Sequence, residues 1–256
     1  MKRLCLPALM LIACSFARNA PLLAAEAKPH VVMLINEDEY KADKTLPAFA
    51  KVLEEKHGCR TTVLDGQGKH EIAGLEALDK ADLVVIYIRR HGLPKEQMDR
   101  VRKYIESGKP LVALRTASHA FAVGANRQAP AGIEQWPDFD VAVLGCHYRG
   151  HGPNDKGTDV SPAKDAAEHP ILKGVAPQKW HSTSSLYYVK PLAKDAAVLL
   201  SGTVDKREEP IAWTWTNKGR RMFYTSLGNV DDFDQPQFRK MLVHAVFWAL
   251  DRPMDK

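Results

Sequence analysis

Three apolar runs constrain the fold of this chain more than any other feature of its sequence. They are HVVMLI at 30–35, ADLVVIYI at 81–88 and PLVALRT at 110–116. The first two are apolar almost throughout and rich in β-branched residues, without the polar alternation of a half-exposed strand. Strands buried on both faces are typical of parallel sheets that carry helices on each side. The runs therefore predict central strands of an α/β fold.

The segments between these runs have helical periodicity, which supports the same fold. A fourth strand, RTTVLD, is expected at 60–65. Gly58 and Gly108 mark the ends of two helices, and Pro94 opens the second. Alternating strands and helices predict a mostly parallel sheet covered on both faces. The apolar helix positions are Leu46, Phe49, Ala50 and Leu53, then Met98, Val101 and Ile105.

The second half of the sequence is less regular. A final helix is expected from the spacing of Phe238, Met241, Leu242 and the apolar residues that follow. The stretch from 126 to 168 is rich in glycine and proline, and a loop of that length is usually functional or disordered. Further strands are expected at 185–192, 196–202, 210–216 and 220–228, with a hairpin turn at 217–220, and a turn and short strand are expected at 169–175.

The first 27 residues have the pattern of an export signal. A basic start precedes a short apolar stretch that Pro7 interrupts, and small residues follow it. The stretch is too short for a helix that spans a membrane. We expect cleavage after Ala27 and a periplasmic or secreted domain of residues 28–256. A lipid anchor at Cys14 is the alternative.

The net charge of the chain bears on its binding partners, and its cysteine content bears on disulfide formation. Removal of the signal lowers the formal net charge from +5 to +3, and no lysine or arginine cluster suggests a nucleic-acid partner. Cys59 and Cys146 are too few for a disulfide framework. We expect two separately buried thiols, with a disulfide between them as the alternative in an oxidising compartment. A homo-oligomer remains open.

Polar residues follow the predicted strands at the point where each strand ends. The carboxyl ends of parallel strands meet at one edge of a sheet, and ligands bind there in open α/β folds. Carboxylates, guanidinium groups and imidazoles should therefore line one polar pocket. The segments concerned are 36–40, 89–91, 115–119, 146–152 and 226–233.

Arg115 stands immediately after a buried run, too close to it for an ordinary surface cation. Such a cation needs an acidic partner or an anionic or hydroxyl-rich ligand. Glu37 or Glu39, at the end of the first strand, is the expected partner. A ligand anchor and a structural ion pair are the two interpretations.

Nucleophilic and metal chemistry are the weaker interpretations of these segments. No cysteine lies in the turn at 115–119, and Thr116 or Ser118 activated by His119 is the remaining nucleophile. His147 and His151 have the spacing of a helical metal site, but the surrounding glycines argue against a helix. A loop could still gather them with His119 and His181, so a divalent metal stays a minor alternative to no cofactor.

Acid–base chemistry is the interpretation that we favour. Glu37 or Glu39 would act as the base and His119 as the acid, because neighbouring charges can separate their pKa values. The residues expected to hold the substrate are Arg89, Arg90, Arg115, Thr116, His147, His151, Tyr187 and Asn229.

The chain resembles the ThuA-like, trehalose-utilisation family. The matching stretches are GKPLVALRTASHAF, HPILKGV, SLYYVKPL, EEPIAWTW, RRMFYTSLGN and FRKMLVHAVFWAL. The resemblance runs from about residue 30 to 252. It implies a flavodoxin-like three-layer sandwich, similar to class I glutamine amidotransferase domains without their cysteine. It also implies a link to the catabolism of disaccharides or keto-sugars, in a subgroup frequent among exported planctomycete-type proteins.

The sequence departs from the family pattern at three places. Many relatives carry a histidine at the position of Arg115, a glutamate near Ser184 and Ser185, and a histidine at the position of Asn229. Two functions follow: a hydrolase or lyase acting on a glycoside or keto-sugar, or a carbohydrate-binding or interaction domain without catalysis. We favour the enzyme, with a small sugar as its partner.

Overall fold

The computed structural model describes residues 27–124, 127–175 and 179–253. Its main feature is a nine-stranded sheet in the order β2-β1-β3-β5-β11-β10-β9-β7-β8. Neighbouring strands from β2 to β11 run parallel, whereas β10, β9, β7 and β8 continue the sheet in antiparallel pairs. The structure is therefore α/β with a large, mostly parallel central sheet, in agreement with the sequence.

The parallel part of the sheet is built by the first half of the chain together with one late strand. Its strands are β1 (His30–Asn36), β2 (Arg60–Asp65), β3 (Leu83–Ile88), β5 (Leu111–Leu114) and β11 (Arg220–Thr225). The antiparallel part consists of β7 (Thr158–Pro162), β8 (Trp180–Ser182), β9 (Ala197–Val204) and β10 (Arg207–Asn217). A separate pair joins β4 (Leu93–Pro94) and β6 (Ile133–Glu134).

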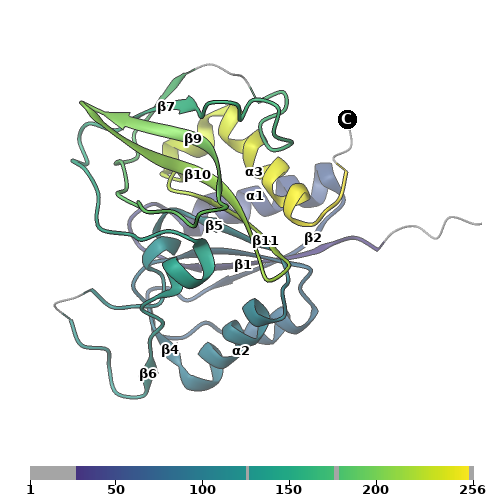
Figure 1. Ribbon diagram of the computed structural model, residues 1–256. Coiled ribbons are helices and arrows are strands. Elements are labelled where there is room, and N and C mark those ends of the chain that lie inside the picture. Colours follow the sequence, from purple (N-terminus) through teal and green to yellow (C-terminus); the bar gives the residue numbers. More distant parts are fainter. Residues whose placement is uncertain (1–26, 125–126, 176–178, 254–256) are drawn as a thin grey trace, which may run out of the picture.

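Helices cover both faces of the sheet (Figure 1). The α-helices are α1 (Ala42–His57), α2 (Lys95–Glu106) and α3 (Pro236–Ala249). The short helical turns are η1 (Leu75–Lys80), η2 (Arg115–His119), the π-helical η3 (Asp140–Leu144) and η4 (Val230–Asp234). Helices α1 and α3 pack on one face, and α2 packs on the other.

Strand β1 shows how the sequence produces these layers. Val31 and Met33 join the core beside α1 and α3, and Val32 and Leu34 join the core beside α2. Successive side chains of a strand point to opposite faces, so both faces of a central strand must be apolar. All seven residues of β1 are buried, as its uninterrupted apolar run predicts.

The predicted strands and helices of the first half are confirmed, but two strands of the second half are wrong. Residues 169–175 form turns, and 185–192 contain only an isolated bridge at Tyr187. Their apolar side chains are buried by neighbouring loops without pairing in the sheet, which apolar content alone cannot distinguish from a strand. The long loop predicted at 126–168 contains β7, which extends the main sheet.

Two other predictions concern the whole chain. Cys59 and Cys146 are free, buried thiols on opposite faces of the sheet, which confirms that they are separate. The predicted export signal, except for Ala27, lies outside the described residues. Within those residues, no helix combines the length and apolar character that crossing a membrane would require.

Candidate functional site

The carboxyl ends of β1, β3 and β5 bring the candidate residues together. Strand β3 lies between β1 and β5, so the segments that follow these strands are neighbours. The guanidinium carbon of Arg115, after β5, lies 4.0 Å from the centre of the Tyr40 ring, which follows β1. The predicted cluster at one sheet edge is therefore present.

Arg115 is buried among aromatic rings and neutral oxygens. Only 1% of its surface is exposed. One terminal nitrogen donates to the Ser226 carbonyl at 2.8 Å and the other to the Ser185 hydroxyl at 3.2 Å. The guanidinium carbon also lies 4.8 Å from the ring centre of Tyr187. No carboxylate of the described residues lies within ion-pair distance of it, so the expected ion pair with Glu37 or Glu39 is wrong.

The backbone at two of these strand ends is strained. Arg115 has φ 42° and Arg90 has φ 55°, in the left-handed region that residues other than glycine rarely adopt. The turn at Arg115 is held by the Tyr224 hydroxyl, which donates to the Arg115 carbonyl at 2.7 Å. Strained residues of this kind concentrate at functional sites, where the surrounding structure fixes them.

Glu37 is not available as a base. One carboxylate oxygen accepts the backbone N–H groups of Glu39 and Tyr40 at 2.8 and 2.7 Å, and the other accepts that of Ala42 at 2.7 Å. These bonds fix the connection between β1 and α1, where a carboxylate satisfies free N–H groups. The sequence placed Glu37 correctly, but the structure gives its carboxylate a structural role.

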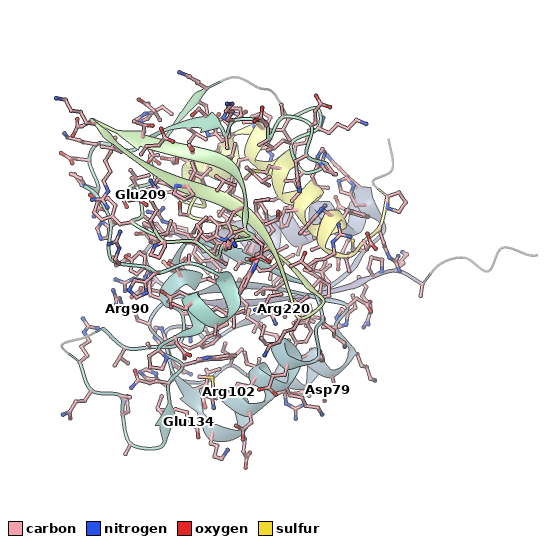
Figure 2. All side chains as sticks on the ribbon, in the orientation of Figure 1. Asp79, Arg90, Arg102, Glu134, Glu209 and Arg220 are labelled. Carbon is pink, nitrogen blue, oxygen red and sulfur yellow. The ribbon has the colours of Figure 1, made fainter. Side chains whose placement is uncertain are left out.

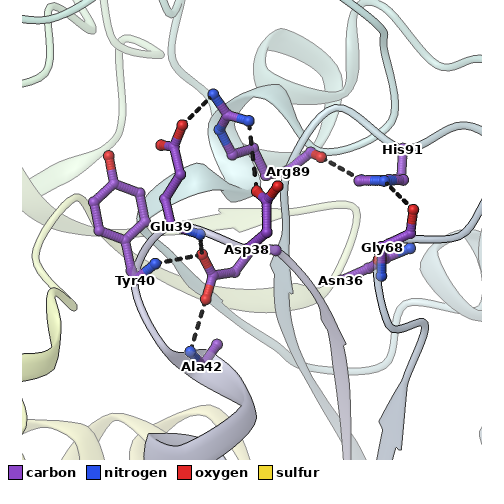
Figure 3. A network of polar contacts seen from close by, with 9 residues as sticks. Asn36, Asp38, Glu39, Tyr40, Ala42, Gly68, Arg89 and His91 are labelled. Carbon is purple, nitrogen blue, oxygen red and sulfur yellow. Dashed lines mark hydrogen bonds and ion pairs between the residues drawn. The ribbon is translucent and has the colours of Figure 1, made fainter.

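Glu39 pairs with Arg89 at the rim of the site (Figure 3). The two groups approach to 2.5 Å, and Asp38 lies 3.7 Å from the same guanidinium. On the other side of Arg89, its carbonyl meets one ring nitrogen of His91 at 2.5 Å. The charge of Arg89 is thus neutralised locally.

His119 has an electrostatic environment that keeps its imidazole neutral. Burial lowers its pKa well below the usual value, and the guanidinium groups of Arg90, Arg89 and Arg115 lower it further, as does His151. The Ser118 hydroxyl lies 3.2 Å from Nδ1 of His119 and 3.3 Å from the Arg115 carbonyl. A hydroxyl that donates to this carbonyl accepts from Nδ1–H, which leaves the lone pair on Nε2.

This result changes the role that the sequence suggested for His119. A general acid must hold a proton at the working pH, and a pKa well below 6.5 means that His119 does not near neutrality. The local charges were unpredictable from spacing, because they depend on arginines that follow two different strands. The imidazole is therefore neutral and its lone pair is free, although the same burial and charges disfavour its protonated form.

Tyr148 covers His119. Their rings stack with centroids 4.3 Å apart and an angle of 23° between them. Burial raises the pKa of Tyr148 to about 12. Tyr148 belongs to a segment that runs antiparallel to 186–189, with His147 donating its N–H to the Val189 carbonyl at 2.9 Å. Successive side chains of an extended segment point in opposite directions, so the exposed His147 is directed away from this ring stack.

The remaining predicted residues occupy different positions. His151 is exposed beside Tyr187, with ring centroids 6.1 Å apart. Tyr187 itself is buried, as is Thr116, whose hydroxyl has no hydrogen-bond partner among the described residues. Asn229 caps η4 by accepting from the Val230 N–H at 2.7 Å, so its side chain holds a helical turn.

The histidine cluster considered as the minor alternative is not seen among the described residues. In the part of the chain that the structure describes, no three His, Cys, Asp or Glu side chains are grouped to hold a metal ion. His181 pairs instead with Asp159 at 2.9 Å, on the edge strand β8. Ser184 donates to Asp232 at 2.7 Å.

Tyr40 and Tyr148 are site residues that the sequence interpretation missed. Both stand inside the strand-end segments, next to charged residues that suggested more obvious chemistry. For Tyr148, the available signal was its place between His147 and Arg149, because successive side chains of an extended segment point in opposite directions. The partly exposed rings of Tyr40 and Tyr148 add apolar surface beside the strand-end arginines and His119.

A larger cavity lies elsewhere, between α1 and α3. It has a volume of about 630 Å³ and is lined by apolar side chains such as Phe49, Val52 and Val243. It holds none of the strand-end arginines, nor His119. Its size does not make it the reactive site, because the polar groups that converge in space are at the strand ends.

Comparisons with known proteins agree with the fold. The family model for trehalose utilisation, ThuA, matches residues 31–249. A ThuA-like protein from Bacteroides uniformis is 20% identical, with 90% of this chain and 95% of that chain covered and a TM-score of 0.66. A ThuA-like protein from Parabacteroides merdae is 16% identical, with coverage of 90% and 92% and a TM-score of 0.62.

A third solved structure belongs to a larger protein. α-L-Fucosidase isoenzyme 2 from Paenibacillus thiaminolyticus is 12% identical and has a TM-score of 0.54, over 87% of this chain and 33% of that chain. At such identities, these structures support the fold alone. No curated protein matches the sequence.

Proposed function

Because the chain belongs to the ThuA family of trehalose utilisation, we propose that it is a lyase-type enzyme acting on a keto-sugar. The family links the protein to carbohydrate metabolism. The observation that carries the finer proposal is the position of His119, stacked on Tyr148 and surrounded by the guanidinium groups of Arg89, Arg90 and Arg115.

The proposed reaction begins at the carbon next to a sugar ketone. The neutral Nε2 of His119 removes the proton, and the C–H electron pair moves toward the carbonyl oxygen to give an enolate. Nearby guanidinium groups stabilise the negative charge that develops there. In a 3-keto-glycoside, the enolate then expels the glycosidic oxygen from the neighbouring carbon, and the imidazolium returns the proton to that leaving oxygen.

This chemistry fits the site better than the two-carboxylate hydrolysis of a glycoside. That mechanism needs one carboxylic acid and one free carboxylate on either side of the scissile bond. Glu37 accepts three backbone N–H groups, and Glu39 is bound to Arg89. Proton removal from a keto-sugar needs only a base and positive charge near the carbonyl oxygen. His119 and the neighbouring guanidinium groups would supply them.

A binding protein without catalysis is the second candidate. The engagement of both carboxylates, Glu37 and Glu39, favours it, because no acidic catalyst is then left at these two positions. Partly exposed Tyr40 and Tyr148 offer ring faces to a sugar.

We further propose that the protein is exported, since its first 27 residues have the pattern of a signal.

Hydrogen–deuterium exchange distinguishes these two functions. The protein is incubated in D₂O with 3-keto-trehalose, and deuterium at the carbon beside the ketone and release of the second sugar are followed by NMR. We expect both for the wild type, and a loss of about 10²–10⁴-fold for His119→Gln. His181→Gln, on the distant edge strand, is the matched control and should match the wild type. Saturable binding without exchange or release would establish the binding protein instead.

A further inference from the structure

The arginines at the strand ends differ in how far nearby carboxylates neutralise their charge. Arg89 has Glu39 at 2.5 Å and Asp38 at 3.7 Å. Across the described residues, no carboxylate lies within ion-pair distance of either Arg90 or Arg115. Figure 2 shows Arg90 at the edge of the molecule where the parallel strands end. The positive charges that no carboxylate neutralises are therefore those of Arg90 and Arg115.

The burial of Arg115 makes its unneutralised positive charge energetically unfavourable. An arginine that is almost fully buried is normally paired with a carboxylate, because removing its charge from water is unfavourable. Here the terminal nitrogens meet a carbonyl and a hydroxyl, the rings of Tyr40 and Tyr187 lie against the guanidinium group, and Nε has no partner among the described residues. Glu37 follows β1, but its oxygens are turned to backbone N–H groups.

Arg90 is the group through which a ligand could meet this charge. It is partly exposed, and its side chain lies along Gly124, where a Cβ added to the glycine would stand 3.2 Å from a terminal nitrogen of Arg90. Its backbone N–H donates to the His119 carbonyl at 3.0 Å, which fixes Arg90 beside the proposed base. An accessible guanidinium presents parallel N–H groups that match a carboxylate.

We propose that the natural substrate of this strand-end site is a sugar acid. Its carboxylate would pair with Arg90, on the same side of the site as the buried charge of Arg115. This inference rests on the proposed function, since it names the substrate class of the same site. Two observations support a carboxylate over a phosphate. Of Arg89, Arg90 and Arg115, Arg90 alone is both accessible and without a carboxylate partner among the described residues, and η2 is too short to offer a phosphate-binding helix terminus.

Calorimetry with three simple ligands tests this inference. The probes are D-glucuronate, D-glucose and glucose 6-phosphate, titrated into the full mature protein at low and high salt. We expect glucuronate to bind at least tenfold more tightly than glucose, and this advantage to shrink as salt rises. Equal affinities for glucuronate and glucose, or tightest binding of glucose 6-phosphate, would overturn the proposal.

Arg90→Gln provides the second arm of the test. It should weaken glucuronate about ten- to a hundredfold while leaving glucose unchanged, because only the charged contact is removed. The matched control is Arg149→Gln, an exposed arginine outside the cleft, with no expected effect. Unchanged glucuronate affinity in a folded Arg90→Gln protein would contradict the proposal, and the salt series gives an independent answer if that variant does not fold.

The outcomes also separate this inference from the proposed function. Tight glucuronate binding without any exchange of a keto-sugar proton would keep the ligand class and reject the enzyme. Turnover of neutral 3-keto-trehalose, with no preference for glucuronate, would keep the enzyme and reject the sugar acid.

Discussion

Arg115 and Arg220 are both buried arginines of the central sheet, but they occupy opposite ends of it. Arg220 begins β11 at the amino edge, where one terminal nitrogen donates to the Ile105 carbonyl at the end of α2 at 2.9 Å. Burial lowers the pKa of Arg220. For Arg115, burial also acts to lower the pKa, but Tyr187, Tyr87 and Tyr40 outweigh it and raise the pKa.

The difference between the two ends indicates what each arginine does. Arg220 connects a helix end to a strand start, and its backbone is ordinary β. Arg115 has a strained backbone, an aromatic cage and a partly exposed histidine four residues further on. Similar burial therefore serves packing at the amino edge and, in our account, charge placement at the carboxyl edge.

The largest effect is expected for Arg115→Ala. Loss of the side chain leaves a cavity and two unpaired acceptors, and should lower the free energy of unfolding by about 3–5 kcal/mol. Denaturant unfolding measures this loss. Arg115→Met keeps most of the volume without the charge, but it leaves the same two acceptors unpaired. Met should therefore be more stable than Ala and lose ligand binding, whereas ligand binding that survives in the folded Met variant would contradict the proposed difference between the two arginines.

A smaller and purely structural effect is expected for Arg220→Ala. It should lower the free energy of unfolding by about 2–3 kcal/mol, since one buried carbonyl loses its donor and a cavity forms. Ligand affinity of the protein that remains folded should equal that of the wild type, as calorimetry below the unfolding transition can establish. A weakened affinity would mean that the amino edge also supports the site.

Glu37→Gln sharpens the comparison at the carboxyl edge. The amide keeps the shape but turns an N–H group toward a backbone N–H, so we expect a loss of about 1–3 kcal/mol in the free energy of unfolding. Thermal unfolding at matched pH gives the measurement. If Glu37 were instead a catalytic base, the exchange reaction would disappear while the stability stayed the same.

The smallest effect concerns pH. The pKa of His119 is lower in the folded protein than its ordinary value of 6.5, so the unfolded chain binds more protons below that pH. Stability should thus fall as pH drops below about 6.5 toward the folded pKa, and His119→Gln should reduce the slope. His30, at the amino edge, also has a pKa lowered by burial and is the matched comparison. An unchanged slope in His119→Gln would show that His119 does not contribute.

Apolar pattern predicted the parallel part of this fold because those strands are buried on both faces. The run of β3 is buried at every position, so its continuous apolar sequence is enough to predict a central strand. Residues 185–192 are apolar for a different reason, since Tyr187 lies against Arg115 and His119 rather than in a ladder. A single sequence cannot separate burial in a sheet from burial beneath a loop.

The site was predictable to the level of the sheet edge and no further. The parallel-sheet rule brought together the segments that contain Tyr40, Arg89 and Arg115, although it did not single out Tyr40. Which carboxylate faces which cation depends on side-chain directions within short turns, and these sent Glu37 to the backbone and Glu39 to Arg89. The lowered pKa of His119 was equally hidden, because three cations from two turns produce it together with burial.

The most direct test of the account is the titration of the His119 imidazole, followed by NMR in the wild type and in Arg90→Gln. The account predicts a pKa well below 6.5 in the wild type, because of burial and the surrounding guanidinium groups, and a higher pKa in Arg90→Gln. A wild-type pKa at or above 6.5 would contradict it, because burial and the guanidinium groups would then not hold the imidazole in its neutral form.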